Sequence, residues 1–298
     1  MPISIRRTAN PSNYRTDPAF NGLGVREAAG RSIAYVDVAG EAESEAAARE
    51  GYNKAQADAR QELILAPDLA QAHLASATVL ELGTLDFTQA SAEYERALAL
   101  APGNARVLRD SGQFAALMGH FDAGLAAVRR AVVLDTLSRE AHGFFAAALN
   151  TARRYEEAVA AYAEVISVEP DFKETYGARG LAYYGLGDLQ SARLSCETQP
   201  DDWRSQQCLA VVYDKLSRHA DAEAELAKMK AAGGDTNAYQ YVTIYAQWGD
   251  RAKALEWLET ALRVRDSGLE GLKTDPLLDP LRKEPRFQAI ERELKFPT

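Results

Sequence analysis

Histidine, the side chain that most often combines acid–base and metal chemistry, is scarce in this 298-residue chain. The four histidines are widely separated: His73, His120, His142 and His219. No two of them stand at the i, i+4 spacing that places two zinc ligands on one face of a helix. We therefore predict no metal site, and surface or inter-helix roles for these side chains.

The two cysteines, Cys196 and Cys208, fall on helices that we expect to be antiparallel neighbours. We predict two buried free thiols, and a disulfide is the alternative if the compartment is oxidising. The first eleven residues contain two arginines but no apolar segment of a signal peptide. No apolar run reaches the roughly 18 residues that span a bilayer. These features predict a cytoplasmic protein with no membrane partner.

Other catalytic patterns are missing from the sequence. It contains no G-x-S-x-G motif and no P-loop, and the spacing of Gly22, Gly24 and Gly30 departs from G-x-G-x-x-G. Acidic pairs such as Glu156–Glu157 occupy positions that face solvent in a helix. The net charge is −9 with no long basic block, which disfavours nucleic-acid binding. We predict a non-enzymatic protein that needs no cofactor and binds no nucleic acid.

A repeated pattern of aromatic and small residues organises most of the chain. In the stretch 153–170, Tyr155, Ala158 and Tyr162 fall on one side of a helix that ends before Pro170. The intervals between successive small residues are 35, 34, 34, 34, 30 and 32. These small residues are Ala55, Ala90, Gly124, Ala158, Ala192, Ala222 and Ala254. Each copy has a second apolar helical segment ahead of it, so the unit is a helix pair.

This pattern resembles the tetratricopeptide repeat (TPR), whose period is about 34 residues. One copy has Gly180, Tyr183 and Gly187 at the family's small, aromatic and turn positions, and the preceding copy has Tyr155, Ala158, Tyr162 and Pro170. The resemblance covers about residues 42–266. It implies an all-α fold: a right-handed α-solenoid of six to seven antiparallel helix pairs that binds protein.

This pattern divides the chain into three parts. They are an irregular N-terminal arm (1–40), the solenoid (41–266), and a proline-rich connection with a C-terminal capping helix (267–298). The capping helix should begin at Pro285 and cover the open end of the solenoid. The shortest interval predicts that one second helix ends near Thr198. Extra residues near Gly83 predict another local irregularity in the stacking.

The tail also resembles the ending of bacterial TPR regions that are fused to class III nucleotide cyclases or winged-helix regulators. Neither a cyclase nor a winged helix is present in this sequence. The resemblance implies an alternative function, in which the chain is the sensor or regulatory part of a system whose catalytic or DNA-binding domain lies elsewhere.

The first helices of the pairs should form a concave, protein-binding groove. Their inward positions mix aromatic, amide and basic side chains, which suits an extended peptide or an amphipathic helix. The groove residues we predict are Arg106, Arg109, Gln113, Phe144, Asn150, Leu181, Tyr184, Lys215, Tyr239 and Thr243. The alternative is that several of them only pack between helices. The N-terminal arm or the solenoid ends could also support self-association, and the sequence does not identify the partner.

Overall fold

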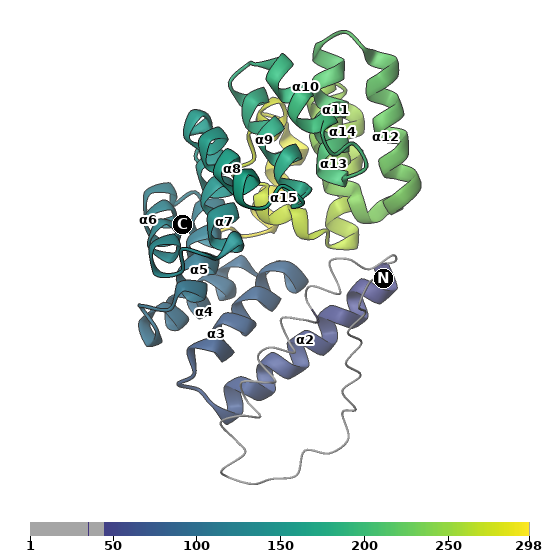
Figure 1. Cartoon of the computed structure of the whole chain (residues 1–298). Helices are drawn as coiled ribbons and strands as arrows, with labels where there is room; N and C mark the ends of the chain where they lie inside the picture. The colour runs from purple at the N-terminus through teal and green to yellow at the C-terminus, as the bar shows by residue number, and fades with distance from the viewer. Residues whose placement is uncertain (1–34, 36–44, 298) are drawn as a thin grey trace, which may run out of the picture.

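The computed structural model describes Tyr35 and residues 45–297, and this part of the chain contains helices and turns but no strand. The N-terminal arm predicted for residues 1–40 therefore lies outside the described residues, apart from Tyr35. Figure 1 shows the helices stacked side by side along a curved path from α2 to α14. The predicted all-α solenoid of antiparallel helix pairs is confirmed.

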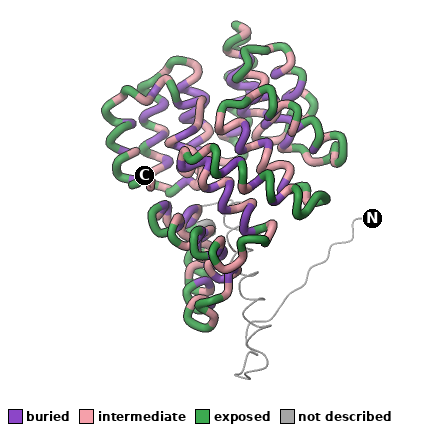
Figure 2. Tube along the Cα trace, turned by 90° about the vertical axis from the view of Figure 1, so that its left-hand side faces the viewer, coloured by how far each residue is buried: buried purple, intermediate pink, exposed green. Residues whose placement is uncertain are grey.

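Each repeat contributes a first helix that lines the concave side and a second helix behind it. The first helices are α3 (Ala70–Thr78), α5 (Ala105–Leu117), α7 (Arg139–Thr151), α9 (Glu174–Gly185), α11 (Trp203–Lys215) and α13 (Ala238–Trp248). The second helices are α2 (Glu45–Leu65), α4 (Phe87–Leu100), α6 (Phe121–Leu134), α8 (Tyr155–Val168), α10 (Leu189–Glu197), α12 (His219–Gly233) and α14 (Arg251–Val264). Figure 2 shows buried positions running through the stack.

The small residues that defined the repeat are the points of closest helix approach. All six alanines of the series are at most 1% exposed. The remaining member of the series is Gly124, where a Cβ would lie 2.6 Å from the Gly112 carbonyl oxygen and 2.8 Å from the Ala116 nitrogen. Only glycine allows α5 and α6 to cross this closely. Turn glycines close other helices in the left-handed region, with φ of 91° at Gly119 and 79° at Gly187.

Both predicted irregularities are present. The second helix α10 ends at Glu197 with Thr198 as its cap, and is only nine residues long. Near Gly83, the first helix α3 continues into a π-helical turn, η1 (Val79–Thr84). A π-helical turn accommodates one extra residue and changes the direction in which the following side chains point.

The expectation of two free thiols is wrong, because Cys196 and Cys208 form a disulfide between α10 and α11. Their Cα atoms are 6.3 Å apart, within the range that a disulfide can join. Gly180 on α9 makes this possible, since a Cβ there would lie 2.0 Å from the Cys196 sulfur. The missing side chain leaves the space that the two sulfur atoms occupy.

The C-terminal segment does more than cover the end of the solenoid. It consists of η3 (Ser267–Gly271), η4 (Pro276–Leu281) and α15 (Pro285–Glu293), and Pro285 begins α15 as predicted. The helix α15 lies against α14, where Arg286 pairs with Glu259 at 2.6 Å. Beyond it, Phe296 stacks on Phe87 of α4 with ring centroids 4.8 Å apart. The tail thus returns to the first described repeats, and in Figure 1 the C-terminus lies near α5 and α6.

Candidate functional site

A channel runs between the first helices and the C-terminal segment. It consists of two cavities of about 710 Å³ each. The residues that line both cavities are Leu117, Ala147, Tyr162, Ala178, Arg204 and Glu270. Because they share these residues, the two cavities adjoin each other, and we call the pair the channel. The segment 268–279 supplies the wall opposite the first helices in one of the two cavities.

The cavity nearer the N-terminus is lined by Arg106, Arg109, Gln113 and Phe144, as the sequence predicted. The Arg109 Nε lies 2.6 Å from a carboxylate oxygen of Asp110, and its guanidinium sits 5.0 Å from the centroid of the Phe144 ring. The ion pair and the ring hold the guanidinium in place against the channel wall. This end of the channel therefore presents aromatic side chains among charged groups of both signs.

The other cavity contains five further predicted groove residues, which are Asn150, Leu181, Tyr184, Lys215 and Tyr239. The Tyr184 hydroxyl donates to the Gln247 side-chain oxygen at 2.6 Å. The Lys215 ammonium donates to the Gln247 carbonyl oxygen at 2.5 Å. These contacts fix both side chains at the wall, so their polar ends are already occupied.

Thr243 does not face the channel. It is fully buried, and its hydroxyl oxygen accepts a 2.8 Å hydrogen bond from the Gln207 amide. The reason is that α13 packs against both α11 and η4, which buries a helix face that lies open in earlier repeats. Tyr239 is only 6% exposed and donates from its hydroxyl to Asp275 at 3.0 Å. Tyr239 therefore anchors the tail.

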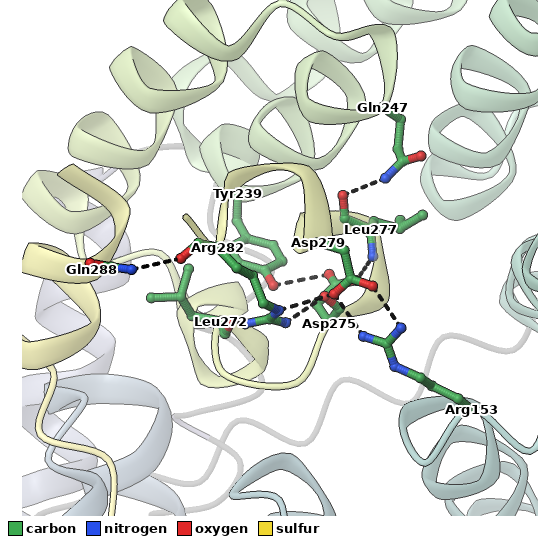
Figure 3. Close-up of polar contacts among 9 residues, drawn as sticks. All are labelled: Arg153, Tyr239, Gln247, Leu272, Asp275, Leu277, Asp279, Arg282 and Gln288. Atoms are coloured by element: carbon green, nitrogen blue, oxygen red, sulfur yellow. Dashed lines mark hydrogen bonds and ion pairs between the residues drawn. The ribbon is translucent and has the colours of Figure 1, made fainter. Parts of the chain in front are cut away.

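Polar contacts fasten the C-terminal segment at its middle, as Figure 3 shows. Arg153, in the turn between α7 and α8, donates two hydrogen bonds to Asp279 at 2.6 and 2.7 Å. This guanidinium lowers the pKa of the Asp279 carboxyl. The Gln247 amide donates to the Leu277 carbonyl oxygen at 2.6 Å. Arg153 and Asp279 are 47% and 42% exposed, so the pair contributes only about 0–1 kcal/mol.

Apolar burial contributes far more to holding the segment. Five of its large side chains have no exposed surface: Leu269, Leu272, Leu278, Leu281 and Phe287. Full burial of such a side chain stabilises by about 1.5–3 kcal/mol, so together they contribute on the order of 10 kcal/mol. The segment is therefore a permanent wall of the channel. The sequence analysis missed this role, although four leucines in a proline-rich connection were a signal of a buried segment.

Three side-chain amide oxygens on the channel wall lack hydrogen-bond partners among the described residues. They are Oε1 of Gln113, Oδ1 of Asn150 and Oε1 of Gln240. Each is buried at the atomic level although its residue lines a cavity. A buried acceptor without a donor is costly, about 1–3 kcal/mol, so a side-chain rotation that turns one of these oxygens toward a ligand donor in the cavity would be favourable.

Solved structures with the same architecture cover most of this chain. PilW, described as a widely conserved type IV pilus biogenesis factor, superposes with a TM-score of 0.57 at 14% identity, covering 70% of this chain and 93% of PilW. Pseudomonas aeruginosa PilF superposes with a TM-score of 0.53 at 17% identity, covering 71% of this chain and 92% of PilF. TTC0263, a thermophilic TPR protein of Thermus thermophilus, superposes with a TM-score of 0.51 at 20% identity, covering 65% of this chain and 99% of TTC0263. The chain has a TPR fold. These identities show the fold alone.

No protein-family model and no curated protein matches the sequence. In the described part of the TPR solenoid, no three histidine, cysteine or carboxylate side chains gather as a metal site. Within the same residues, no helix is both long enough and apolar enough to cross a bilayer.

Proposed function

We propose that the channel binds an extended segment of a partner protein and that the chain acts as a non-enzymatic scaffold. The observation that carries this proposal is the set of three unpartnered amide oxygens, on Gln113, Asn150 and Gln240, whose residues line two adjoining cavities. An extended peptide presents backbone N–H groups along its length, and these can donate to the three oxygens. The predicted groove is retained, without Thr243 and with Tyr239 as an anchor of its wall.

An extended ligand fits these acceptors better than a helix does. In an α-helix the backbone N–H groups are bonded to carbonyl oxygens four residues earlier, so they have no donor to offer from the helix middle. A helix is also about 10–12 Å across with its side chains, whereas the tail already occupies one side of the concave surface. The sequence analysis left both ligand types open, and we choose the extended one.

The test is cross-linking from inside the channel. A photoreactive residue at Phe144 should form adducts with a partner in native lysate, whereas one at the exposed Ala160 on α8 should not. Overlapping peptides of the captured protein should then contain one segment that binds the purified chain. Asn150→Ala should weaken that peptide by about 2–10-fold, the range for a lost hydrogen bond. Equal adducts from Phe144 and Ala160, or no binding segment, would contradict the proposal.

The proposed compartment follows from the disulfide. Structural disulfides persist in oxidising compartments and are rare in the cytosol of mesophiles. The Cys196–Cys208 bond therefore argues against the predicted cytoplasmic location, and we propose an oxidising compartment. Both cysteines are fully buried in the folded chain, so cells are denatured directly in the presence of an alkylating reagent, which labels any free thiol. An oxidising compartment leaves both cysteines unlabelled, whereas two labelled cysteines would restore the cytoplasmic prediction.

A second candidate function keeps the same channel in a different setting. The tail resembles the ending of TPR regions fused to cyclases or winged-helix regulators, so the chain could regulate such a domain in another protein. In that case the cross-linked partner carries the catalytic or DNA-binding domain. Self-association through the N-terminal arm or the solenoid ends remains a prediction, which the molar mass in solution tests.

A further inference from the structure

Two carboxyl side chains meet inside the channel, one from each end of the solenoid. Glu81 belongs to the π-helical turn η1 of the first described pair, and Glu270 belongs to η3 of the C-terminal segment. The turns η1 and η3 pack against each other, which brings the two carboxyl groups together. Glu81 is only 6% exposed, and its carboxylate also accepts from the Tyr94 hydroxyl at 2.5 Å. Both carboxyls line the channel, and Glu270 lines both of its cavities.

A hydrogen bond between two carboxyl groups requires a proton on one of them, because ionised carboxylates only accept. We propose that the Glu81–Glu270 pair is a proton-dependent latch that joins the first described repeats to the C-terminal segment. With the proton present, η3 stays against η1. Once it is lost, two buried negative charges face each other and push these two turns apart. The buried leucines keep the rest of the segment docked.

The charges around the pair offer little compensation. Tyr94 from α4 donates to Glu81, while Asp110 from α5 and Asp266 beside η3 add further negative charge. Asp110 is itself paired with Arg109, and Tyr52 of α2 faces Glu270. The cation that acts on Glu270 is Arg204 of α11. Burial raises the pKa of Glu270 to about 7, and burial together with Glu270 raises that of Glu81 well above its ordinary range.

The π-helical turn explains why Glu81 reaches this position. The turn redirects residues 79–84. Gly83 within it packs against the Tyr52 ring, because a Cβ on this residue would lie only 2.9 Å from the Cδ1 atom of Tyr52. In a regular α-helix, which lacks the extra residue, the Glu81 side chain would point in a direction rotated about the helix axis by one residue. The irregularity that the sequence showed near Gly83 therefore serves to place one carboxyl of the latch.

Hydrogen exchange at fixed pH tests the latch without any partner. Glu81→Gln keeps an N–H donor for Glu270 at every pH, so its η1 and η3 amides should exchange alike at pH 6 and pH 8 after correction for intrinsic rates. Those of the wild type should match Glu81→Gln at pH 6 and exchange faster at higher pH, by about tenfold for each pH unit above the point at which the pair loses its last proton. Glu256→Gln on exposed α14 is the control and should behave as wild type.

Infrared spectroscopy of the wild type gives a second reading that needs no variant. The C=O band of a protonated carboxyl should be present at pH 6 and lost at higher pH. A wild type that still exchanges like Glu81→Gln at a pH where the protonated-carboxyl band has been lost would overturn the latch. So would a wild-type spectrum without a protonated-carboxyl band at pH 6.

Discussion

The two halves of the solenoid share one repeat pattern but differ in what covers their first helices. Gly143 on α7 and Gly177 on α9 occupy the same position in successive repeats. A Cβ at Gly143 would meet nothing within 4 Å, whereas one at Gly177 would lie 2.5 Å from the backbone of Arg204 and Ser205. The same residue type is open to the channel in one repeat and packed against the next helix in the other.

This difference separates an open channel wall from a packed support. The half with the regular interval, α3–α8, carries the wall of aromatic and charged side chains around Phe144. The half with the shortened interval, α9–α14, contains the disulfide and packs α13 against the tail. A repeat that departs from the period thus gains contacts that a regular repeat lacks. Three sets of substitutions and one double-mutant cycle test this comparison.

The largest effect should come from the tail. Leu278→Ala removes a fully buried side chain and should lower the free energy of unfolding by about 2–5 kcal/mol. Leu137→Ala is the control in the regular half, where the side chain is 94% exposed, and should stay within about 0.5 kcal/mol of wild type. Urea denaturation measures both. Equal effects would mean that the tail is not packed as described.

The disulfide should come next. Replacing both Cys196 and Cys208 by alanine should cost about 2–4 kcal/mol, the usual contribution of a bond that closes a short loop. Denaturing the wild type with a reductant present should reproduce the loss. If neither treatment lowers the urea midpoint, the bond contributes nothing to the packed half.

The glycine pair should give effects of opposite sign. Gly177→Ala forces a methyl group into the α11 backbone and should destabilise by about 1–3 kcal/mol. Gly143→Ala has room and should stabilise by up to about 1 kcal/mol, because alanine favours a helix over glycine. Thermal denaturation of the two variants compares them directly. A loss of stability at Gly143 would show that the regular half is also packed.

The ion pair between Arg153 and Asp279 should have the smallest effect. A double-mutant cycle with alanine at both positions should give a coupling of about 0.2–1 kcal/mol that decreases as salt is added. The comparison pair is Arg154 and Glu157, which lies at the start of α8 and does not touch the tail. A coupling of several kcal/mol would mean that this contact, rather than the leucines, holds the segment.

Most of the fold could be predicted from the sequence because it depends on local spacing. The small residues mark helix crossings wherever they recur, and the shortened interval correctly located the end of α10 near Thr198. The disulfide was missed because it depends on three helices at once. Gly180 had been assigned to a family position, and nothing in its spacing indicated that two sulfur atoms would fill the space beside it.

The path of the C-terminal segment could not be predicted, because its contacts join distant parts of the chain. Thr274 donates to the Leu117 carbonyl oxygen, and Phe296 stacks on Phe87, across more than one hundred residues in each case. The prolines showed where the repeat ends but not the direction that follows. Thr243 was assigned to the groove because its repeat position faces inward, whereas the packing of α13 against both α11 and η4 buries it.

The central claim is that the tail is a permanent wall of the channel, and native-state hydrogen exchange of the full chain tests it most directly. The amides of Leu272, Thr274 and Leu278 each donate a backbone hydrogen bond within the segment. At pH 6, where the Glu81–Glu270 pair is protonated, we predict that they exchange only through global unfolding, with the same free energy of opening as amides in the middle of α13. Exchange at the rate of a free peptide, while α13 stays protected, would contradict the claim.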